Sequence, residues 1–235
     1  MILSWIEDAK HRAVLKALDP IKTGWVIGLG SGTTMSYAVK ELARLRRARH
    51  IEVVVVPTSY QIENLAIAHG LTIKSINEVG TIDYAIDGAD QVQHGSLNVI
   101  KGGGGALLRE KIIDSAAQTL VIVVHAPKLS KYLGGNQTVP VEILPFAYKY
   151  VQSRIVKLGG RAKLRESTSK MGPVITDNGN FLLDADFGLI QNPERLERRL
   201  KAIPGLLETG LFLNMVDKVY VGSIHGVKLL TAKMP

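Results

Sequence analysis

The sequence WVIGLGSGTTMSYAVKEL occupies residues 25–42 and decides how the first part of the chain folds. An apolar, β-branched run stops at Gly30, and a loop of glycine and hydroxyl residues leads into an amphipathic pattern of helical spacing. Further strand-like runs, each ending in a loop rich in Gly, Asp or Pro, lie at residues 51–57, 81–90, 96–105 and 119–127. Short strands that alternate with helices predict a mostly parallel α/β sheet flanked by helices.

The loops after these strands are the first place to look for a binding site. In a Rossmann-like parallel sheet, ligands bind beyond the carboxyl ends of the strands, near the point where the strand order reverses. We therefore expect the loops at residues 30–34, 87–90 and 101–105 to meet at one edge of the sheet.

The pattern changes near Thr138. From there the expected order is strand, helix, strand, strand, helix, strand, which predicts a smaller α+β domain of the ferredoxin-like type. The strands are expected at residues 139–146, 161–167, 173–186 (a hairpin) and 205–212, and the helices from Tyr148 and from Pro193.

Turn and cap residues support this second unit. Residues 177–180 read Asp–Asn–Gly–Asn, which tolerate positive φ at the hairpin turn, and Asn192 is placed to cap a helix. Residues 217–230 resemble two more strands that return to the first domain. The expected domains are therefore an α/β domain at residues 1–137 plus 211–235 and a ferredoxin-like domain at residues 138–210.

Composition limits the functional classes. The 235 residues carry a net charge of +8, contain no cysteine and include no apolar run of membrane-spanning length. Glu7 and Asp8 interrupt the place where an export signal would be apolar, so we expect a cytoplasmic protein with no membrane partner. The six histidines show no metal-ligand spacing, so no metal site is expected. The basic run at residues 44–49 admits nucleic-acid binding, but without interleaved aromatic residues it fits a solvated helix end better.

The glycine loop of residues 26–34 predicts an anion site. Its glycines allow a tight turn, the helix start presents free amides, and Ser31, Thr33 and Thr34 add hydroxyl donors beside Gly32. A dinucleotide fingerprint would need glycine where Thr33 stands, and a nucleotide P-loop would need a following Lys–Ser or Lys–Thr pair. A monophosphate is the favoured ligand, and a purely structural turn remains the alternative.

Two acidic loops accompany it. Asp87 and Asp90 follow a strand and flank Gly88, which fits an ordinary turn and also a pair of carboxylates that exchange protons with sugar hydroxyls. Lys101 then precedes four glycines and a helix that carries Glu110, with Leu107, Ile112 and Ile113 as expected core residues. The amides of Gly102, Gly103 and Gly104, beside the Lys101 charge, can stabilise an oxyanion. Glu110 fits a general base, although a carboxylate in the first turns also suits the helix dipole.

These groups suffice to move a proton between adjacent carbons of a phosphorylated sugar. A carboxylate removes the proton next to the carbonyl and returns it to the neighbouring carbon, while positive charge and amides stabilise the enediolate between the two steps. Neither a metal nor an organic cofactor is needed for this chemistry.

The motifs GLGSGTT, DGAD, KGGGGALLREK, PVEILPF, ITDNGN and IPGLLETGLF also resemble the metal-independent ribose-5-phosphate isomerases of type A, in the correct order along almost the full chain. The resemblance implies interconversion of ribose 5-phosphate and ribulose 5-phosphate through a cis-enediolate, in the non-oxidative pentose phosphate pathway. It implies that Glu110 is the base, that Asp87, Asp90 and Lys101 are further active-site groups, and that Ser31, Thr33 and Thr34 bind phosphate. It adds Lys10 and Lys128 near the phosphate and the substrate, and a homodimer or homotetramer without cofactor.

Three positions depart from the family pattern. Gln91 stands where glutamate is usual, the loop around His94 is about one residue longer than in some members, and Thr33 replaces a commoner serine. None of these changes removes a proposed catalytic group.

Two alternatives from other classes remain. A non-catalytic sugar-phosphate-sensing regulatory domain would keep the phosphate loop without needing Lys101 and Glu110, which are both present here. A nicotinamide oxidoreductase is disfavoured by Thr33 and by the missing acid after the strand at residues 51–57.

Overall fold

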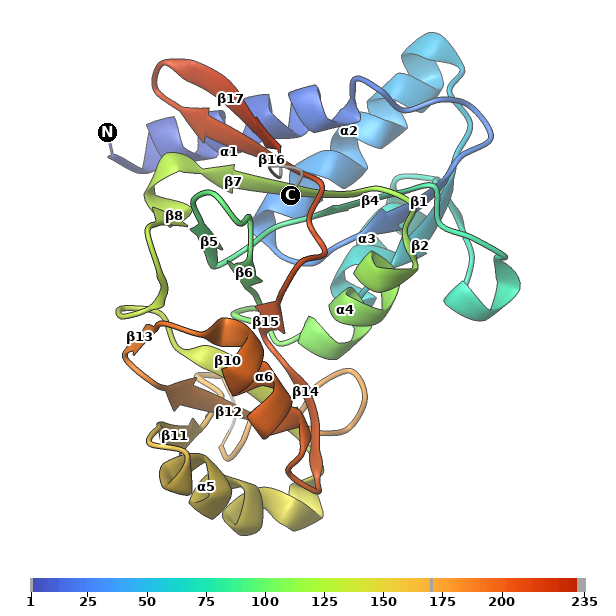
Figure 1. Cartoon of the computed structure of the whole chain (residues 1–235). Coiled ribbons are helices and arrows are strands. Elements are labelled where there is room, and N and C mark those ends of the chain that lie inside the picture. Colours follow the sequence, from blue (N-terminus) through green and yellow to red (C-terminus); the bar gives the residue numbers. More distant parts are fainter. Residues whose placement is uncertain (1, 170, 232–235) are drawn as a thin grey trace.

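The chain builds a seven-stranded sheet with the order β17-β16-β7-β4-β1-β2-β3 (Figure 1), in a computed structural model that describes residues 2–169 and 171–231. All neighbouring strands run parallel except β16 and β17. The expected mostly parallel α/β sheet is confirmed. Its strands are β1 (Val26–Leu29), β2 (Val54–Pro57), β3 (Thr72–Ile73), β4 (Tyr84–Asp87), β7 (Leu120–His125), β16 (Lys218–Ser223) and β17 (Gly226–Thr231).

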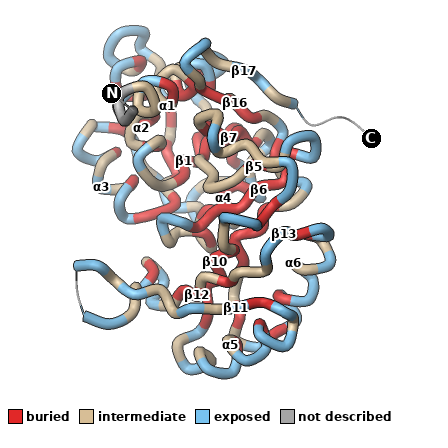
Figure 2. Tube along the Cα trace, turned by 90° about the vertical axis from the view of Figure 1, so that its left-hand side faces the viewer, coloured by how far each residue is buried: buried red, intermediate tan, exposed pale blue. Residues whose placement is uncertain are grey.

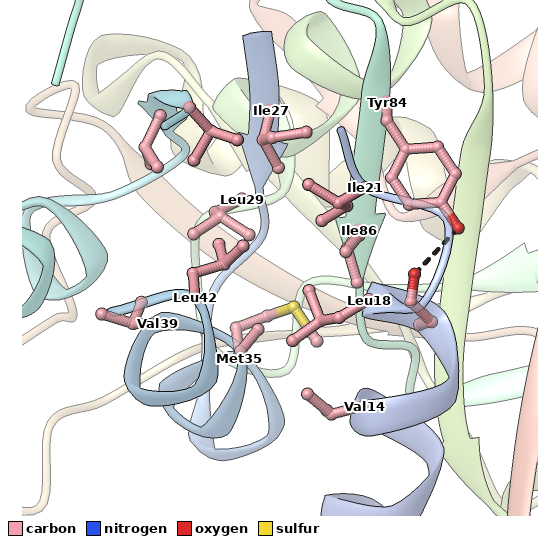
Figure 3. Close-up of a cluster of buried hydrophobic side chains, with 14 of the residues drawn as sticks. Val14, Leu18, Ile21, Ile27, Leu29, Met35, Val39, Leu42, Tyr84 and Ile86 are labelled. Carbon is pink, nitrogen blue, oxygen red and sulfur yellow. Dashed lines mark hydrogen bonds between the residues drawn. The ribbon is translucent and has the colours of Figure 1, made fainter. Parts of the chain in front are cut away.

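Helices cover both faces of this sheet, which explains its continuous apolar strands. On one face, α1, α2 and α3 pack on side chains such as Tyr84 and Ile86, and on the other face α4 packs on Val56 and Ile82. Figure 3 shows the first core, where the Tyr84 hydroxyl donates to the carbonyl of Ala17 at 3.1 Å. None of the described helices is long and apolar enough to cross a membrane. The helices are α1 (Ile2–Leu18), α2 (Thr33–Arg49), α3 (Tyr60–Ala68) and α4 (Leu107–Ala116), with the short turn η1 (Ile76–Glu78) after β3.

A second, smaller sheet corrects one prediction. Residues 96–105 do not continue the parallel sheet, because their strand β6 pairs antiparallel with β5 and with β15. A parallel neighbour would need a crossover of about a dozen residues or more, and the chain between β4 and β6 is too short for one. The four strands of this sheet are β5 (Gln91–Gln93), β6 (Val99–Ile100), β8 (Leu129–Ser130) and β15 (Leu211–Phe212).

The smaller α+β unit has the expected ferredoxin-like order. Its four-stranded antiparallel sheet runs β11-β12-β10-β14, and α5 and α6 supply the two crossovers. In Figure 2, buried strands run through both units, while the outer turns of the helices are exposed. The Asn192 side chain accepts a hydrogen bond from the Arg195 amide and caps α6, as predicted. The elements are β10 (Val139–Ile143), η3 (Pro145–Ala147), α5 (Tyr148–Lys157), β11 (Arg161–Leu164), β12 (Phe181–Asp186), α6 (Pro193–Lys201) and β14 (Leu206–Thr209), while η2 (Ala126–Lys128) and the pair β9 (Leu133–Gly134) and β13 (Leu189–Ile190) join the units.

The structure corrects three local predictions, one of them in α4. The strand expected at residues 205–212 divides into β14 and β15, because Gly210 lies against another backbone: a Cβ there would stand 2.2 Å from the Lys101 carbonyl oxygen. The hairpin expected at residues 173–186 keeps its turn and an antiparallel bridge between Ile175 and Phe181, but β12 takes β11 and β10 as its strand partners. Ile112 is 47% exposed, on the outer side of α4.

Candidate active site

The strands β7, β4 and β1 end side by side at one edge of the large sheet. The strand order reverses there, since β2 and β3 continue on one side while β7 and β16 continue on the other. A cavity of about 410 Å³ opens at this edge. Every residue predicted for the site lines it except Asp87, which lies behind the wall. The predicted residues that line it are Lys10, Ser31, Gly32, Thr33, Thr34, Asp90, Lys101, Gly102, Gly103, Gly104, Glu110 and Lys128.

Lys101 is buried between two carboxylates at the inner end of this site. Its Nζ lies 2.8 Å from Asp87 Oδ2 and 3.3 Å from Glu110 Oε2, and it donates a hydrogen bond to the Gly88 carbonyl at 2.8 Å. The exposed fractions of Asp87, Lys101 and Glu110 are only 0%, 2% and 4%. A buried charge is costly unless it is paired, so the three side chains hold one another in their charged or shared-proton states.

Burial sets the ionisation of the two groups that face the cavity. It raises the pKa of Glu110 to about 7, where the charge of Asp87 adds to the effect and Lys101 opposes it. Burial by itself favours neutral Lys101, but Asp87 and then Glu110 outweigh it, and the pKa of Lys101 is raised. Lys101 therefore stays a cation, while Glu110 can take and return a proton near neutral pH.

The glycine run is held in place by its neighbours. Gly102 and Gly105 have φ of 102° and 84°, a backbone conformation that side-chain-bearing residues rarely adopt. The Gly103 amide donates to Asp90 Oδ2 at 2.7 Å, and the Gly105 amide donates to the Gly102 carbonyl at 3.0 Å. Within residues 2–169 and 171–231, the amides of Gly102 and Gly104 have no protein partner. The four glycines therefore leave two free amides, those of Gly102 and Gly104, to bind an oxyanion; we call this pair the amide nest.

Asp90 stands between this nest and a lysine. One of its oxygens accepts from Gly103, and the other lies 3.9 Å from Lys128 Nζ. Unlike Asp87, Asp90 reaches the cavity and can contact a substrate hydroxyl. The two aspartates, which look equivalent in the sequence, therefore occupy different environments.

The other end of the cavity is the amino-terminal end of α2, an anion-binding arrangement. Gly32, with φ of 94°, turns the chain into the helix. Lys10 Nζ donates a hydrogen bond to Thr33 Oγ1 at 3.4 Å. The Ser31 hydroxyl is fixed at 2.7 Å from the Thr58 hydroxyl and at 2.7 Å from the Ser59 hydroxyl. Amides, hydroxyls and a lysine thus converge on one place.

Two titratable residues of the cavity, Glu7 and His125, were not predicted from the sequence. Glu7 holds Lys10 at 2.8 Å and accepts from the Tyr37 hydroxyl at 2.9 Å, and these two contacts lower the pKa of Glu7. His125 ends β7 beside the cavity, and burial, followed by Lys128 and Lys10, lowers its pKa. His125 could have been predicted from the sequence, because it is the last residue of a strand that ends at the expected edge of the sheet. Glu7 gives no comparable signal beyond lying one turn before Lys10.

The departures at Gln91 and His94 have local structural explanations. Gln91 Nε2 donates a hydrogen bond to the Gly134 carbonyl at 3.0 Å, and Gln91 Oε1 accepts one from the Gly134 backbone amide at 2.8 Å. A glutamate could not donate the first of these bonds. The His94 backbone amide donates to the Ser130 carbonyl at 2.8 Å, which ties its loop to β8.

Gly30 is the closest backbone approach in the site. A Cβ at this position would lie 1.8 Å from Asp87 Oδ1, which is fully buried. We expect Gly30→Ala to lower the free energy of unfolding by about 1–3 kcal/mol, because the buried carboxylate must move. Urea unfolding checks this. Gly80→Ala is the matched control, since a Cβ at Gly80 meets nothing within 4 Å. Equal stabilities of the two variants would show that Asp87 is free to shift.

The turn of residues 177–180 ties the smaller unit to both ends of the site. Asp177 Oδ2 accepts from the Tyr60 amide at 2.8 Å, next to Ser59, which supports the phosphate loop. Arg109, next to Glu110, donates to Asn178 Oδ1 at 2.7 Å and to the Asp177 carbonyl at 2.8 Å. The turn therefore holds the start of α3 and the start of α4 together.

A buried carboxylate anchors this turn. Glu142, which is 0% exposed, accepts hydrogen bonds from Thr176, Asn178 and Asn180 at 2.9, 3.0 and 2.8 Å. We expect Asn178→Ala to cost about 1.5–3 kcal/mol of unfolding free energy, since a charged acceptor loses a donor. Chemical denaturation, with exposed Asn136→Ala as control, measures it, and a loss no larger than the control's would contradict the anchoring role.

Known proteins of similar sequence carry one family name. The family model described as Ribose 5-phosphate isomerase A (phosphoriboisomerase A) matches residues 54–226. The ribose-5-phosphate isomerase A of Methanococcus aeolicus is 45% identical over 223 residues, covering 95% of this chain and 94% of the relative. That of Pyrococcus horikoshii is 44% identical over 226 residues, covering 96% and 98%.

Solved structures agree with the sequence relatives. A D-ribose-5-phosphate isomerase in complex with phospho-erythronic acid superposes with a TM-score of 0.94 at 44% identity, covering 96% of this chain and 99% of that one. Ribose 5-phosphate isomerase A from Methanocaldococcus jannaschii gives a TM-score of 0.92 at 40% identity, with the same coverage of 96% and 99%. The chain belongs to the ribose-5-phosphate isomerase A family.

Proposed function

We propose that this chain interconverts D-ribose 5-phosphate and D-ribulose 5-phosphate, an aldose–ketose isomerisation of the non-oxidative pentose phosphate pathway. One observation carries the proposal: a carboxylate with a pKa near 7 lies 3.3 Å from a buried lysine, in a cavity whose other end is an anion site. Such a cavity accepts a sugar with a phosphate at one end and a reactive carbonyl at the other. The family membership supports the same substrate.

Binding is assigned to the helix end and its lysine. We assign the phosphate to the start of α2, where Thr33 and Thr34 offer hydroxyls and Lys10 adds positive charge. Ser31 and Gly32 shape this loop, since the Ser31 hydroxyl donates to Ser59 and the Gly32 amide donates to Gln61 Oε1 at 2.9 Å. Lys128 lies near Asp90 and can contact a sugar hydroxyl or the phosphate. The carbonyl end of the open-chain sugar then reaches Lys101 and the glycine amides.

The chemistry needs one base and one oxyanion site. Ionised Glu110 removes the proton from C2 of the aldose, the C2–H electrons form the C1=C2 bond, and the carbonyl oxygen on C1 becomes an enediolate oxygen. Lys101 and the amides of Gly102 and Gly104 stabilise that oxygen. Glu110 then returns the proton to C1, while a hydroxyl proton moves from O2 to O1 and leaves a ketone at C2. We assign contact with these hydroxyls to Asp90, and we assign to Asp87 the holding of Lys101.

The chain supplies every group that these reaction steps need, so we propose that no metal or organic cofactor takes part. The regulatory alternative is not favoured, since a sensor has no use for a buried lysine between two carboxylates. Purified protein with ribose 5-phosphate should form ribulose 5-phosphate, measured by the ketose product, and a chelator should leave the rate unchanged. Binding of the sugar phosphate without turnover would instead favour the sensor.

Activity should depend on pH through Glu110. A base works only when ionised, so kcat/KM should fall about tenfold for each pH unit below about 7, the pKa of Glu110. Initial rates at saturating and limiting substrate across about two units on either side of neutrality measure this acid limb. A limb near the ordinary glutamate pKa of about 4.3 would contradict the tuning of Glu110 by burial.

We propose two domains, residues 138–210 and residues 1–137 plus 211–235, which the separate antiparallel and parallel sheets support; residues 1, 170 and 232–235 lie outside the described residues. A cytoplasmic location agrees with the absence of cysteine. A homodimer or homotetramer follows from the family resemblance, and light scattering of the purified protein tests it.

A further inference from the structure

A third buried carboxylate lies behind the site and has no role in the proposed reaction. Asp114 stands one helical turn after Glu110 on α4 and is 3% exposed, but it does not line the cavity. Both of its oxygens are buried, and within the described part of the chain neither receives a hydrogen bond from a donor. It shares the buried face of α4 with Glu110, and Asp87 is the group whose charge and side-chain hydrogen bonding act most strongly on it.

If every acid around Asp114 were ionised, the buried negative charges would outnumber the buried positive charge. Asp87, Glu110 and Asp114 surround a single buried cation, Lys101. Asp87 has Lys101 at 2.8 Å and the Gly88 amide at 2.6 Å, and Glu110 has Lys101 at 3.3 Å. Of these three acids, Asp114 alone has no compensating donor among residues 2–169 and 171–231, and an uncompensated buried charge is strongly unfavourable.

Two carboxyl groups in contact can form a hydrogen bond only when one of them carries a proton. Asp87 is the one with donors, so it is the acceptor of the pair. Burial, and then the charge of Asp87, raise the pKa of Asp114 well above its usual range, with Lys101 opposing and Glu110 adding to the rise.

We propose that Asp114 is a positioning residue that stays protonated throughout the reaction and donates a hydrogen bond to Asp87, holding that carboxylate against Lys101. The inference rests on the proposed role of Glu110 as the base. Asp87 is thereby fixed from behind, and Lys101 keeps its place at the oxyanion site. A neutral Asp114 also spares Glu110 the repulsion of a second buried anion on the same helix face.

The experiment compares two variants with different chemistry at this position. Asp114→Asn keeps the shape and a donor but cannot ionise, so it should keep kcat within about threefold and leave the acid limb of kcat/KM where the wild type has it. Asp114→Ala removes the donor, so it should lower kcat by about 10- to 100-fold with little change in KM, because Lys101 is misplaced while the phosphate site is remote. Exposed Asp19→Asn is the control.

Infrared spectroscopy gives a readout that does not depend on catalysis. About two pH units above the pKa of Glu110, the wild type should still show the C=O stretching band of a neutral carboxylic acid, and Asp114→Asn should lack it. This band tests Asp114 even if the wild type proves inactive on ribose 5-phosphate, or if Asp114→Ala does not fold. Absence of the band, a loss in Asp114→Asn as large as in Asp114→Ala, or wild-type kcat in Asp114→Ala would each overturn the proposal.

Discussion

Glu110→Gln should lower kcat by about 10²–10⁴-fold while substrate binding survives. The amide keeps the size of the side chain but cannot accept the proton from C2, and general-base contributions are of this order. Substrate binding should survive because the phosphate contacts lie at the other end of the cavity, at the start of α2. Steady-state kinetics with ribose 5-phosphate measure kcat, and calorimetric titration with the substrate measures binding.

A matched control separates catalysis from the helix dipole. Glu63 also occupies the first turn of its helix, α3, but it lies outside the cavity. Glu63→Gln should therefore leave kcat unchanged, although it removes the same favourable placement. If Glu110→Gln kept wild-type turnover, Glu110 would be a helix-end carboxylate and another group would be the base.

Lys101→Met should have the largest effect on stability. It leaves Asp87 and Glu110 buried without their cation, and breaking a buried pair on one side costs about 3–5 kcal/mol of unfolding free energy. The variant should also lose isomerase activity, because the enediolate oxygen loses its positive neighbour. Urea unfolding at neutral pH measures the first effect.

The stability deficit of Lys101→Met should shrink as the pH falls. Lys101 lowers the pKa of both Asp87 and Glu110, so its removal lets burial raise these pKa values further. The carboxyls then take up protons at a higher pH, and the buried charge disappears. Lys16→Met is the control, since its pair with Asp19 is 3.1 Å long but more than half exposed and should be worth less than about 1 kcal/mol. A deficit in Lys101→Met no larger than in this control would show that the buried triad is not an ion-paired cluster.

Most of the predicted cavity residues could be found from the sequence because they follow strand ends, whereas Lys10 lies on α1 and came only from the family resemblance. Parallel strands bring their carboxyl ends to one edge, so the loops at Gly30, Asp87 and His125 meet whatever the details of packing. The glycines before the helix of Glu110 pointed to the same place, even though their strand, β6, lies in a different sheet from the one expected. Local pattern thus located the site without a correct strand pairing.

The roles within the site could not be read in the same way, because they depend on contacts between distant segments. Asp87 and Asp90 lie three residues apart in one loop, yet Asp87 is fully buried against Lys101 while Asp90 faces the cavity. The turn at Asp177 touches Tyr60, 117 residues earlier in the chain. Such contacts follow from how the smaller unit docks on α3 and α4, which no local pattern encodes.

Proton exchange at carbon tests most directly whether Glu110 moves a proton between C2 and C1. In D₂O the wild type should, over repeated turnover, incorporate solvent deuterium at C2 of ribose 5-phosphate and C1 of ribulose 5-phosphate, followed by proton NMR. Glu110→Gln should lose this exchange in proportion to its loss of kcat. Retention of the original hydrogen after many wild-type turnovers would indicate direct hydride transfer, and wild-type exchange in Glu110→Gln would place the base elsewhere.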